Sequence, residues 1–123
     1  MTIAFWCVLI AGLLPYAAFA LAAASLNPSL PRLAATRLEG LPARAHGAHL
    51  NAFEAFGFFA AAVIIAFLVE GASGWTNGLA IGFIIVRLGH IGFYLADISA
   101  LRSACFALGM LLILAIFVQA ALH

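Results

Sequence analysis

The sequence predicts an all-α integral membrane protein, a bundle of four helices that each cross the bilayer. Of its 123 residues, 67% are hydrophobic and 7% are charged, and the mean hydropathy is +1.23. Soluble domains carry about 25% charged residues, so this chain lacks the polar groups needed to cover a water-exposed globule. The net charge of +1 provides no basic surface for a nucleic acid. The composition therefore excludes a soluble enzyme, a disordered tail and a nucleic-acid-binding module.

Four apolar stretches are each long enough to span the membrane, because about 20 apolar residues cross a ~30 Å hydrocarbon core as a helix. We expect helices over residues 2–24, 42–69, 75–97 and 101–122, within one membrane domain that covers residues 1–123. Pro15 lies inside the first helix and is expected to bend it. Residues 1–10 contain no Lys or Arg, so we expect a retained span and not a cleaved signal peptide.

The arginines indicate the orientation, because Lys and Arg accumulate in cytoplasmic loops. Arg32, Arg37 and Arg44 lie in or beside the first connection, and Arg102 flanks the third. The second connection contains only Glu70 as a charged residue. We therefore expect the first and third connections in the cytoplasm and both termini on the outer side.

Polar residues recur along one face of the second and of the third expected helix. Their spacings of three and four residues place each set on a stripe about 80° wide, since successive helical residues are 100° apart. The second helix carries Arg44, Gly47, Asn51 and Glu54, and the third carries Arg87, His90, Tyr94 and Asp97. An ionisable group near the bilayer centre costs about 2.5–3.5 kcal/mol, so these groups are expected to face the bundle interior.

The two stripes lie at matching depths, because the second helix leaves the cytoplasmic side and the third returns to it. At 1.5 Å per residue, Asn51 and His90 both lie about 10 Å deep, and Glu54 and Arg87 about 15 Å deep. We predict an ion pair between Glu54 and Arg87, within one subunit or between subunits, because neither charge is tolerated alone at that depth.

Two interpretations of the stripes remain open on this evidence. A satisfied buried polar network can serve only to fix the register of the helices. Alternatively, the stripes form a half-buried pocket for a small polyanion, open to the cytoplasm. An excess of arginine over acidic residues near the cytoplasmic rim favours the pocket, because Arg binds carboxylates in a bidentate way. The histidines show no spacing typical of a metal site, and none is expected.

A family resemblance rests on short segments of the last three helices. The segment from Arg44 to Glu54 resembles the signature on the second helix of the MAPEG family (membrane-associated proteins in eicosanoid and glutathione metabolism). The positions that fit that signature are Ala48, His49, Asn51 and Glu54. The third helix and the start of the fourth are similar to the family's at Arg87, His90, Tyr94, Leu101, Arg102 and Ser103.

The resemblance implies a homotrimer in a bacterial inner membrane, with both termini in the periplasm and glutathione bound between neighbouring subunits. It implies glutathione-dependent transferase or peroxidase activity on lipophilic electrophiles or hydroperoxides from the bilayer, with glutathione as co-substrate. Arg102 and Ser103 would be catalytic, stabilising the glutathione thiolate. The residues implied to bind glutathione are Arg44, Asn51, Glu54, Arg87, His90 and Tyr94.

Two positions depart from the family pattern. Gly47 stands where the well-studied enzymes carry an Arg, which removes one carboxylate anchor and leaves Arg44, one turn away, as a substitute. Phe106 stands where some members carry a Tyr near the thiol. Both departures favour an alternative function, a non-catalytic membrane protein that binds a small anion or a lipid head group. A four-span drug exporter would need a carboxylate in its first helix, which has none.

Overall fold

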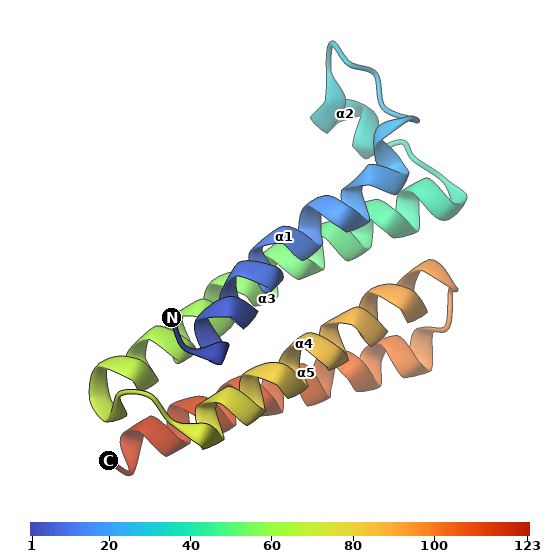
Figure 1. The fold of residues 1–123 in the computed structure, drawn as a ribbon. Helices are drawn as coiled ribbons and strands as arrows, with labels where there is room; N and C mark the ends of the chain where they lie inside the picture. Colours follow the sequence, from blue (N-terminus) through green and yellow to red (C-terminus); the bar gives the residue numbers. More distant parts are fainter.

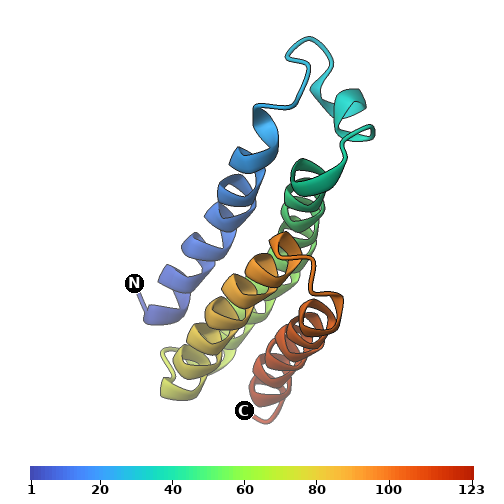
Figure 2. The same cartoon turned by 90° about the vertical axis from the view of Figure 1, so that its right-hand side faces the viewer.

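Four long helices and one short helix make up the computed structural model, which describes residues 1–123. Their bounds are α1 Ile3–Ala23, α2 Pro31–Ala35, α3 Gly40–Glu70, α4 Gly74–Leu95 and α5 Ser99–Ala121. The long helices run side by side, α1 against α3 and α4 against α5 (Figures 1 and 2). Both chain termini and the α3–α4 connection lie at one end, which we call the termini end (Figure 1). α2 and the α4–α5 connection lie at the opposite end, the α2 end (Figure 1).

All four long helices are long and apolar enough to cross a membrane, with mean hydropathies between 1.7 and 2.4. Large apolar side chains cover the outside of the bundle; Leu68 is 76% exposed and Trp75 is 75% exposed. In water this surface would be unfavourable, whereas lipid tails solvate it. The expectation of an all-α, four-span fold is confirmed, and the chain is a multi-pass membrane protein.

The connections differ in detail from the expected ones. The first connection contains α2, which was not expected. Pro31 is the first residue of α2, where the amide hydrogen that proline lacks would have no hydrogen-bond partner within the helix. α4 ends at Leu95, two residues before its expected end, because Asp97 adopts a left-handed backbone with φ 61°. Gly71, with φ 74°, ends α3 in the way glycine often ends helices. α1 continues through Pro15, which is buried.

Small residues and a few aromatic rings fill the core near the termini end. Alanines from α1, α3, α4 and α5 are buried there, and this allows close approach of the helices. The rings of Phe59 and Phe83 stack with centroids 4.0 Å apart and an interplanar angle of 14°. This apolar core occupies the termini half of the bundle, so the polar residues of α3 and α4 are left for the α2 half.

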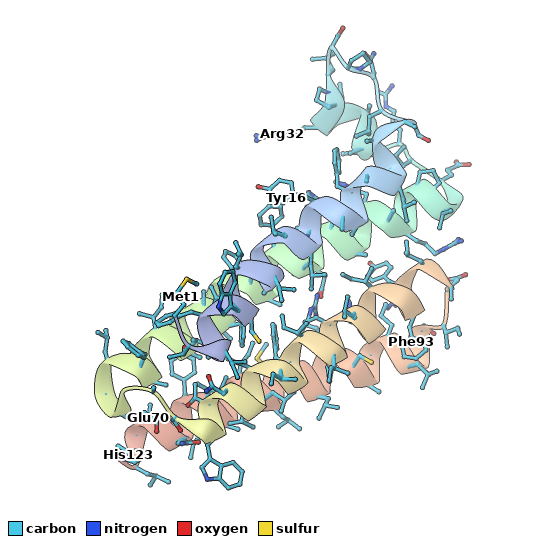
Figure 3. All side chains as sticks on the ribbon, in the orientation of Figure 1. Met1, Tyr16, Arg32, Glu70, Phe93 and His123 are labelled. Carbon is cyan, nitrogen blue, oxygen red and sulfur yellow. The ribbon has the colours of Figure 1, made fainter.

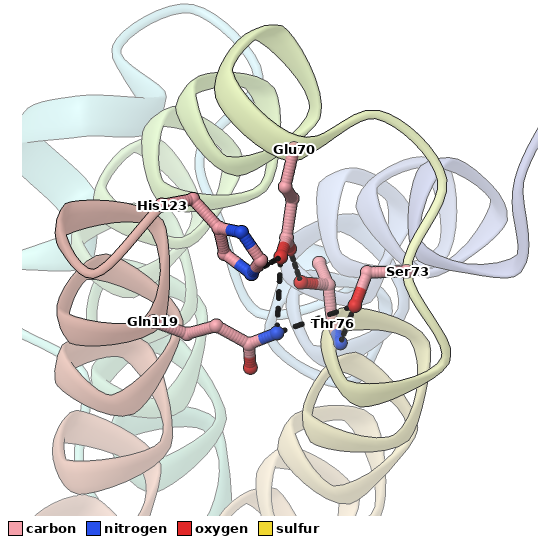
Figure 4. Close-up of polar contacts among 5 residues, drawn as sticks. All are labelled: Glu70, Ser73, Thr76, Gln119 and His123. Atoms are coloured by element: carbon pink, nitrogen blue, oxygen red, sulfur yellow. Dashed lines mark hydrogen bonds and ion pairs between the residues drawn. The ribbon is translucent and has the colours of Figure 1, made fainter.

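A buried carboxylate ties three helices together at the termini end (Figures 3 and 4). The side chain of Glu70 is 3% exposed and accepts hydrogen bonds from the Thr76 hydroxyl and, at 3.0 Å, from Nε2 of Gln119. Nε2 of His123 lies 3.1 Å from the same carboxylate. Gln119 Nε2 also donates to Oγ of Ser73, the N-cap of α4, at 3.2 Å. Glu70 thus joins the end of α3 to the start of α4 and the end of α5.

Glu70→Ala is expected to lower the thermal unfolding midpoint of the detergent-solubilised protein. The change leaves the Thr76 and Gln119 donors without their acceptor, and each unpaired buried group costs about 1–3 kcal/mol. Glu39→Ala is the matched control, because Glu39 is exposed and makes no ion pair. Equal midpoints for the two variants would contradict a stabilising role of the Glu70 carboxylate.

Candidate functional site

A polar cavity of about 210 Å³ lies between α3, α4 and α5 in the α2 half of the bundle. Its lining comprises Asn51, His90, Tyr94, Arg102, Ser103 and Phe106. Five of these six residues are ones that the sequence singles out as candidate site residues. Ser103 and Phe106 are exposed on the surface of α5, so the cavity opens on that side of the bundle. No acidic residue lines it.

The antiparallel α3–α4 hairpin places the two polar stripes face to face. Nη2 of Arg87 donates a hydrogen bond of 2.7 Å to Oδ1 of Asn51, and Arg87 as a whole is 3% exposed. A buried guanidinium needs such a partner because desolvation of an unpaired charge is costly. This contact joins the two stripes directly beside the cavity.

The predicted ion pair between Glu54 and Arg87 does not form within the chain, and the prediction is wrong there. Asn51 and Glu54 are three residues apart on α3, which turns them about 60° from each other around the helix axis. That rotation is enough to leave Glu54 exposed while Asn51 faces α4. The long side chain of Arg87 reaches one turn toward the α2 end and bonds Asn51.

Arg44 also lies elsewhere than in the cavity lining. Its Nε donates to the carbonyl oxygen of Leu95 at 3.0 Å, at the last residue of α4. A cation at this position interacts favourably with the negative end of the helix dipole. Arg44 therefore links the end of α4 to α3, and Asp97, the last residue of the polar stripe on the third expected helix, is exposed.

The aromatic ring of Tyr94 packs against the guanidinium of Arg102. The Arg102 Cζ lies 4.5 Å from the centroid of the Tyr94 ring, a cation–π contact between α5 and α4. The ring of His90 meets the Tyr94 ring edge-on with centroids 5.7 Å apart. Arg102, which the resemblance implies to be catalytic, is thus positioned by an aromatic face next to the cavity.

Gly47 makes room for the Tyr94 ring. A β-carbon at position 47 would lie 2.7 Å from Tyr94 Cζ, closer than side chains approach one another. Compared with the family pattern, Gly47 indicates the loss of a side chain that would bind a carboxylate. The structure adds a second consequence, because only glycine lets Tyr94 lie against α3 in this position.

His90 is the most deeply buried polar residue of the cavity lining. It is 2% exposed, and its Nδ1 has no hydrogen-bond partner within the protein. A buried polar atom without a partner is unfavourable, so a molecule in the cavity that bonds His90 would gain free energy there. Together with the Arg102 charge and the absence of acidic lining residues, this makes the cavity suitable for an anionic ligand.

The comparison with known proteins agrees with this architecture. A model of the MAPEG family matches residues 3–122. The chain belongs to the MAPEG family. No curated protein and no solved structure gives a significant match. The family match covers all four spans and every residue that lines the polar cavity.

The structure of this MAPEG protein divides the eight candidate site residues into two groups. Asn51, His90, Tyr94, Arg102 and Ser103 line the cavity, and Arg87 contacts one of them from behind. Arg44 bonds the end of α4 and Glu54 is exposed on α3, so neither lines the cavity of a single chain. Phe106 also lines the cavity, although its sequence signal was only a departure from the family pattern.

Gly47→Ala tests the packing of Tyr94 in this MAPEG protein. The new methyl group is expected to displace the Tyr94 ring and with it Arg102, which weakens ligand binding to the cavity. Gly57→Ala is the matched control on the same helix, because nothing lies within 4 Å of a β-carbon there. That variant should unfold at the parent temperature or above it, since alanine favours a helix by about 1 kcal/mol over glycine. Thermal unfolding measures stability, and calorimetric titration with glutathione, the ligand that the family resemblance implies, measures binding. Equal behaviour of the two variants would rule out a special role of Gly47.

Proposed function

We propose that this MAPEG protein is a glutathione-dependent transferase or peroxidase that works as a homotrimer. The observation that carries the proposal is the cavity in which Arg102 and Ser103 stand beside His90 and Tyr94 without an acidic neighbour. Glutathione suits such a cavity chemically, because it brings two carboxylates, a thiol and several amide groups. Arginine and buried polar atoms without partners are the groups that bind such an anion.

The size of the cavity supports completion of the site by a second subunit. At about 210 Å³ the cavity of one chain is smaller than the ~300–1,000 Å³ typical of ligand sites. Glu54 is exposed at a depth where an unpaired carboxylate is costly, so it needs a partner from outside its own chain. The α-amine of a glutathione bound to the neighbouring subunit is such a partner. In a trimer, Glu54 of one copy would then take part in the site of the next.

The proposed chemistry depends on ionisation of the glutathione thiol, whose pKa resembles the ~8.5 of free cysteine. The Arg102 guanidinium and the Ser103 hydroxyl stabilise the thiolate, and the thiol proton leaves to water at the open side of the cavity. With an aryl halide, the thiolate sulfur forms a bond to carbon and the halide leaves with its electron pair. With a hydroperoxide, the thiolate attacks the terminal oxygen and the O–O bond breaks, and the alkoxide leaves and takes a proton from water to become an alcohol. A second glutathione then reduces the resulting sulfenic acid, giving glutathione disulfide and water.

The lipophilic second substrate would reach the thiolate from the bilayer. Phe106 lines the cavity and is 43% exposed, so it offers an apolar rim between the cavity and the lipid. The arginines Arg32, Arg37 and Arg44 lie at the α2 end, which supports placing that end in the cytoplasm and both termini in the periplasm. A bacterial inner membrane with this orientation gives the cavity access to cytoplasmic glutathione.

The proposal is tested with the purified protein in detergent. Conjugation of glutathione to a chlorinated nitrobenzene and reduction of cumene hydroperoxide measure the two activities, and calorimetry measures glutathione binding. Turnover in either assay together with binding supports the proposal. No turnover in both assays together with no binding would exclude it.

One observation favours a second function, a non-catalytic membrane protein that binds a small anion or a lipid head group. The ring of Phe106 occupies the cavity wall with its centroid 6.5 Å from that of His90, so this part of the wall offers no hydroxyl to a thiol. Glutathione binding without turnover in either assay would support this second function. Phe106→Tyr would then be the variant in which to look for a gain of turnover.

A further inference from the structure

A second cavity, of about 590 Å³, lies between α1, α2 and α3 and shares no lining residue with the polar cavity. Its volume falls within the ~300–1,000 Å³ typical of small-molecule sites. The residues that give it chemical character are Tyr16, Phe19, Arg32, His46, His49 and Leu50. The function proposed above assigns no role to it.

The polar part of this cavity has basic groups and no acid. Arg32, on α2, makes no ion pair, and no acidic residue lines the cavity. Nδ1 of His46 is buried without a hydrogen-bond partner. The proton of a neutral His46 therefore lies more favourably on Nε2, because a buried lone pair costs less than a buried N–H. Arg32 and His46 therefore carry N–H donors for which the protein itself supplies no acceptor.

His49 is held in one tautomer beside His46. Its Nδ1 lies 2.7 Å from the carbonyl oxygen of Pro15, and because a carbonyl only accepts, Nδ1 carries the hydrogen. Nε2 of the neutral ring is then free to accept a proton or a hydrogen bond. The two imidazole rings stack with centroids 5.9 Å apart. An acidic group can thus find both a donor and a proton acceptor on the same wall.

The rest of the wall is apolar and opens sideways on the bundle. Tyr16 is 60% exposed and Leu50 is 48% exposed, and both line the cavity. Phe19 packs on His49 with ring centroids 4.9 Å apart. Arg32 extends from α2 on the same side of the molecule as Tyr16 (Figure 3). An opening of this kind faces lipid once α1 and α3 span the bilayer.

The depth of the lining residues matches the boundary between head groups and acyl chains. His46 follows the start of α3 by six residues, and Tyr16 precedes the end of α1 by seven, so both lie about 10 Å inside their helix ends. α2 stands beyond the end of α1 (Figure 1). Arg32, on α2, therefore lies at the level of lipid head groups, His46 and Tyr16 lie together about 10 Å inside the helix ends, and Leu50 lies about 6 Å deeper among the chains.

We propose that the second cavity binds an amphiphile with a single acidic head group and a long acyl chain. The acid group bonds Arg32 and the imidazoles of His46 and His49. The chain leaves past Tyr16 and Leu50 into the bilayer. Binding here involves no covalent step and does not depend on glutathione. A free fatty acid and an anionic membrane lipid both offer this chemistry.

The test uses the full-length protein in nanodiscs of phosphatidylcholine and a 16-carbon fatty acid with a photoreactive group in its chain. We expect cross-links on the peptides that contain Tyr16 and Leu50, and competition by palmitic acid but not by hexadecanol, which lacks the acid. Arg32→Gln should weaken binding about tenfold or more, the loss expected for one charge-assisted hydrogen bond. Arg37→Gln, which removes a neighbouring exposed arginine outside the cavity, should bind as the parent does.

Several outcomes would overturn the proposal. Cross-links elsewhere on the bundle, equal competition by hexadecanol, or equal losses in Arg32→Gln and Arg37→Gln would each do so. Leu50→Trp, which narrows the opening without changing charge, should also reduce cross-linking. Repeating the assay with phosphatidylglycerol in the nanodiscs distinguishes the sources of the ligand. Displacement by phosphatidylglycerol that depends on Arg32 supports the site with a membrane lipid as occupant, and its absence supports the site with a free acid.

Discussion

Arg102→Ala is expected to lower kcat/KM for glutathione conjugation by about 10²–10³, the loss seen when one donor to a developing anion is removed. The guanidinium interacts more strongly with a thiolate than with a thiol, so it stabilises the reacting form more than the bound ground state. Glutathione affinity at a pH where the thiol is protonated should change by less than about tenfold, because in the proposed role Arg102 contacts the sulfur and not the substrate carboxylates. Steady-state kinetics and calorimetry on the same preparation give both numbers.

Two further variants make this result specific to Arg102. Arg37→Ala removes an exposed arginine at the same end of the bundle and should leave kinetics unchanged. Arg102→Lys keeps the charge but loses the planar group that stacks on Tyr94 at 4.5 Å, so its activity should fall between those of the parent and Arg102→Ala. If Arg102→Ala raised KM with an unchanged kcat, Arg102 would serve binding and not thiolate stabilisation.

The spans and the side-by-side arrangement of the stripes were predictable because lipid imposes few solutions. Unpaired backbone groups are excluded from hydrocarbon, so spanning segments form helices or a closed barrel, and continuous apolar stretches of about 20 residues are typical of helices. The spacing of Asn51 on one helix and of His90 and Tyr94 on the next then placed these side chains in one interior region, where they line one cavity. Periodicity and depth were sufficient for these positions because each side chain is short relative to a helical turn or rigid.

The contacts of the long side chains were not predictable from depth alone. Arg87 reaches a full turn to Asn51, and Arg44 bonds the Leu95 carbonyl in place of a residue at its own level. Helix periodicity fixes the position of a Cα to within a fraction of a turn. The flexible side chain of arginine can place its guanidinium a full turn away from that position. The exposure of Glu54 follows from a rotation of about 60° between positions three residues apart, which an 80°-wide stripe does not resolve.

Asn51→Leu is expected to destabilise the bundle by about 3–5 kcal/mol, because it leaves the Arg87 guanidinium buried without its partner. The geometry behind this expectation is the 2.7 Å hydrogen bond and the 3% exposure of Arg87. Arg87→Met removes the charge and leaves only the Asn51 amide unpaired, at about 1–3 kcal/mol. The double variant replaces both groups by apolar ones and should be close to the parent in stability. Reversible unfolding in mixed detergent gives the free energy of unfolding of the parent, the two single variants and the double variant. These four values complete a double-mutant cycle.

The same four proteins decide between the two interpretations of the polar stripes. If Asn51 and Arg87 only fix the register of α3 against α4, the double variant should bind glutathione less well only to the extent that it unfolds. If the pair serves a ligand site, the double variant should be as stable as the parent and yet lose glutathione binding. Stability that survives while binding is lost would show that the charge is kept at this depth for the ligand. A stable Asn51→Leu single variant would contradict the interpretation that the pair fixes the register, since the guanidinium would then have another partner.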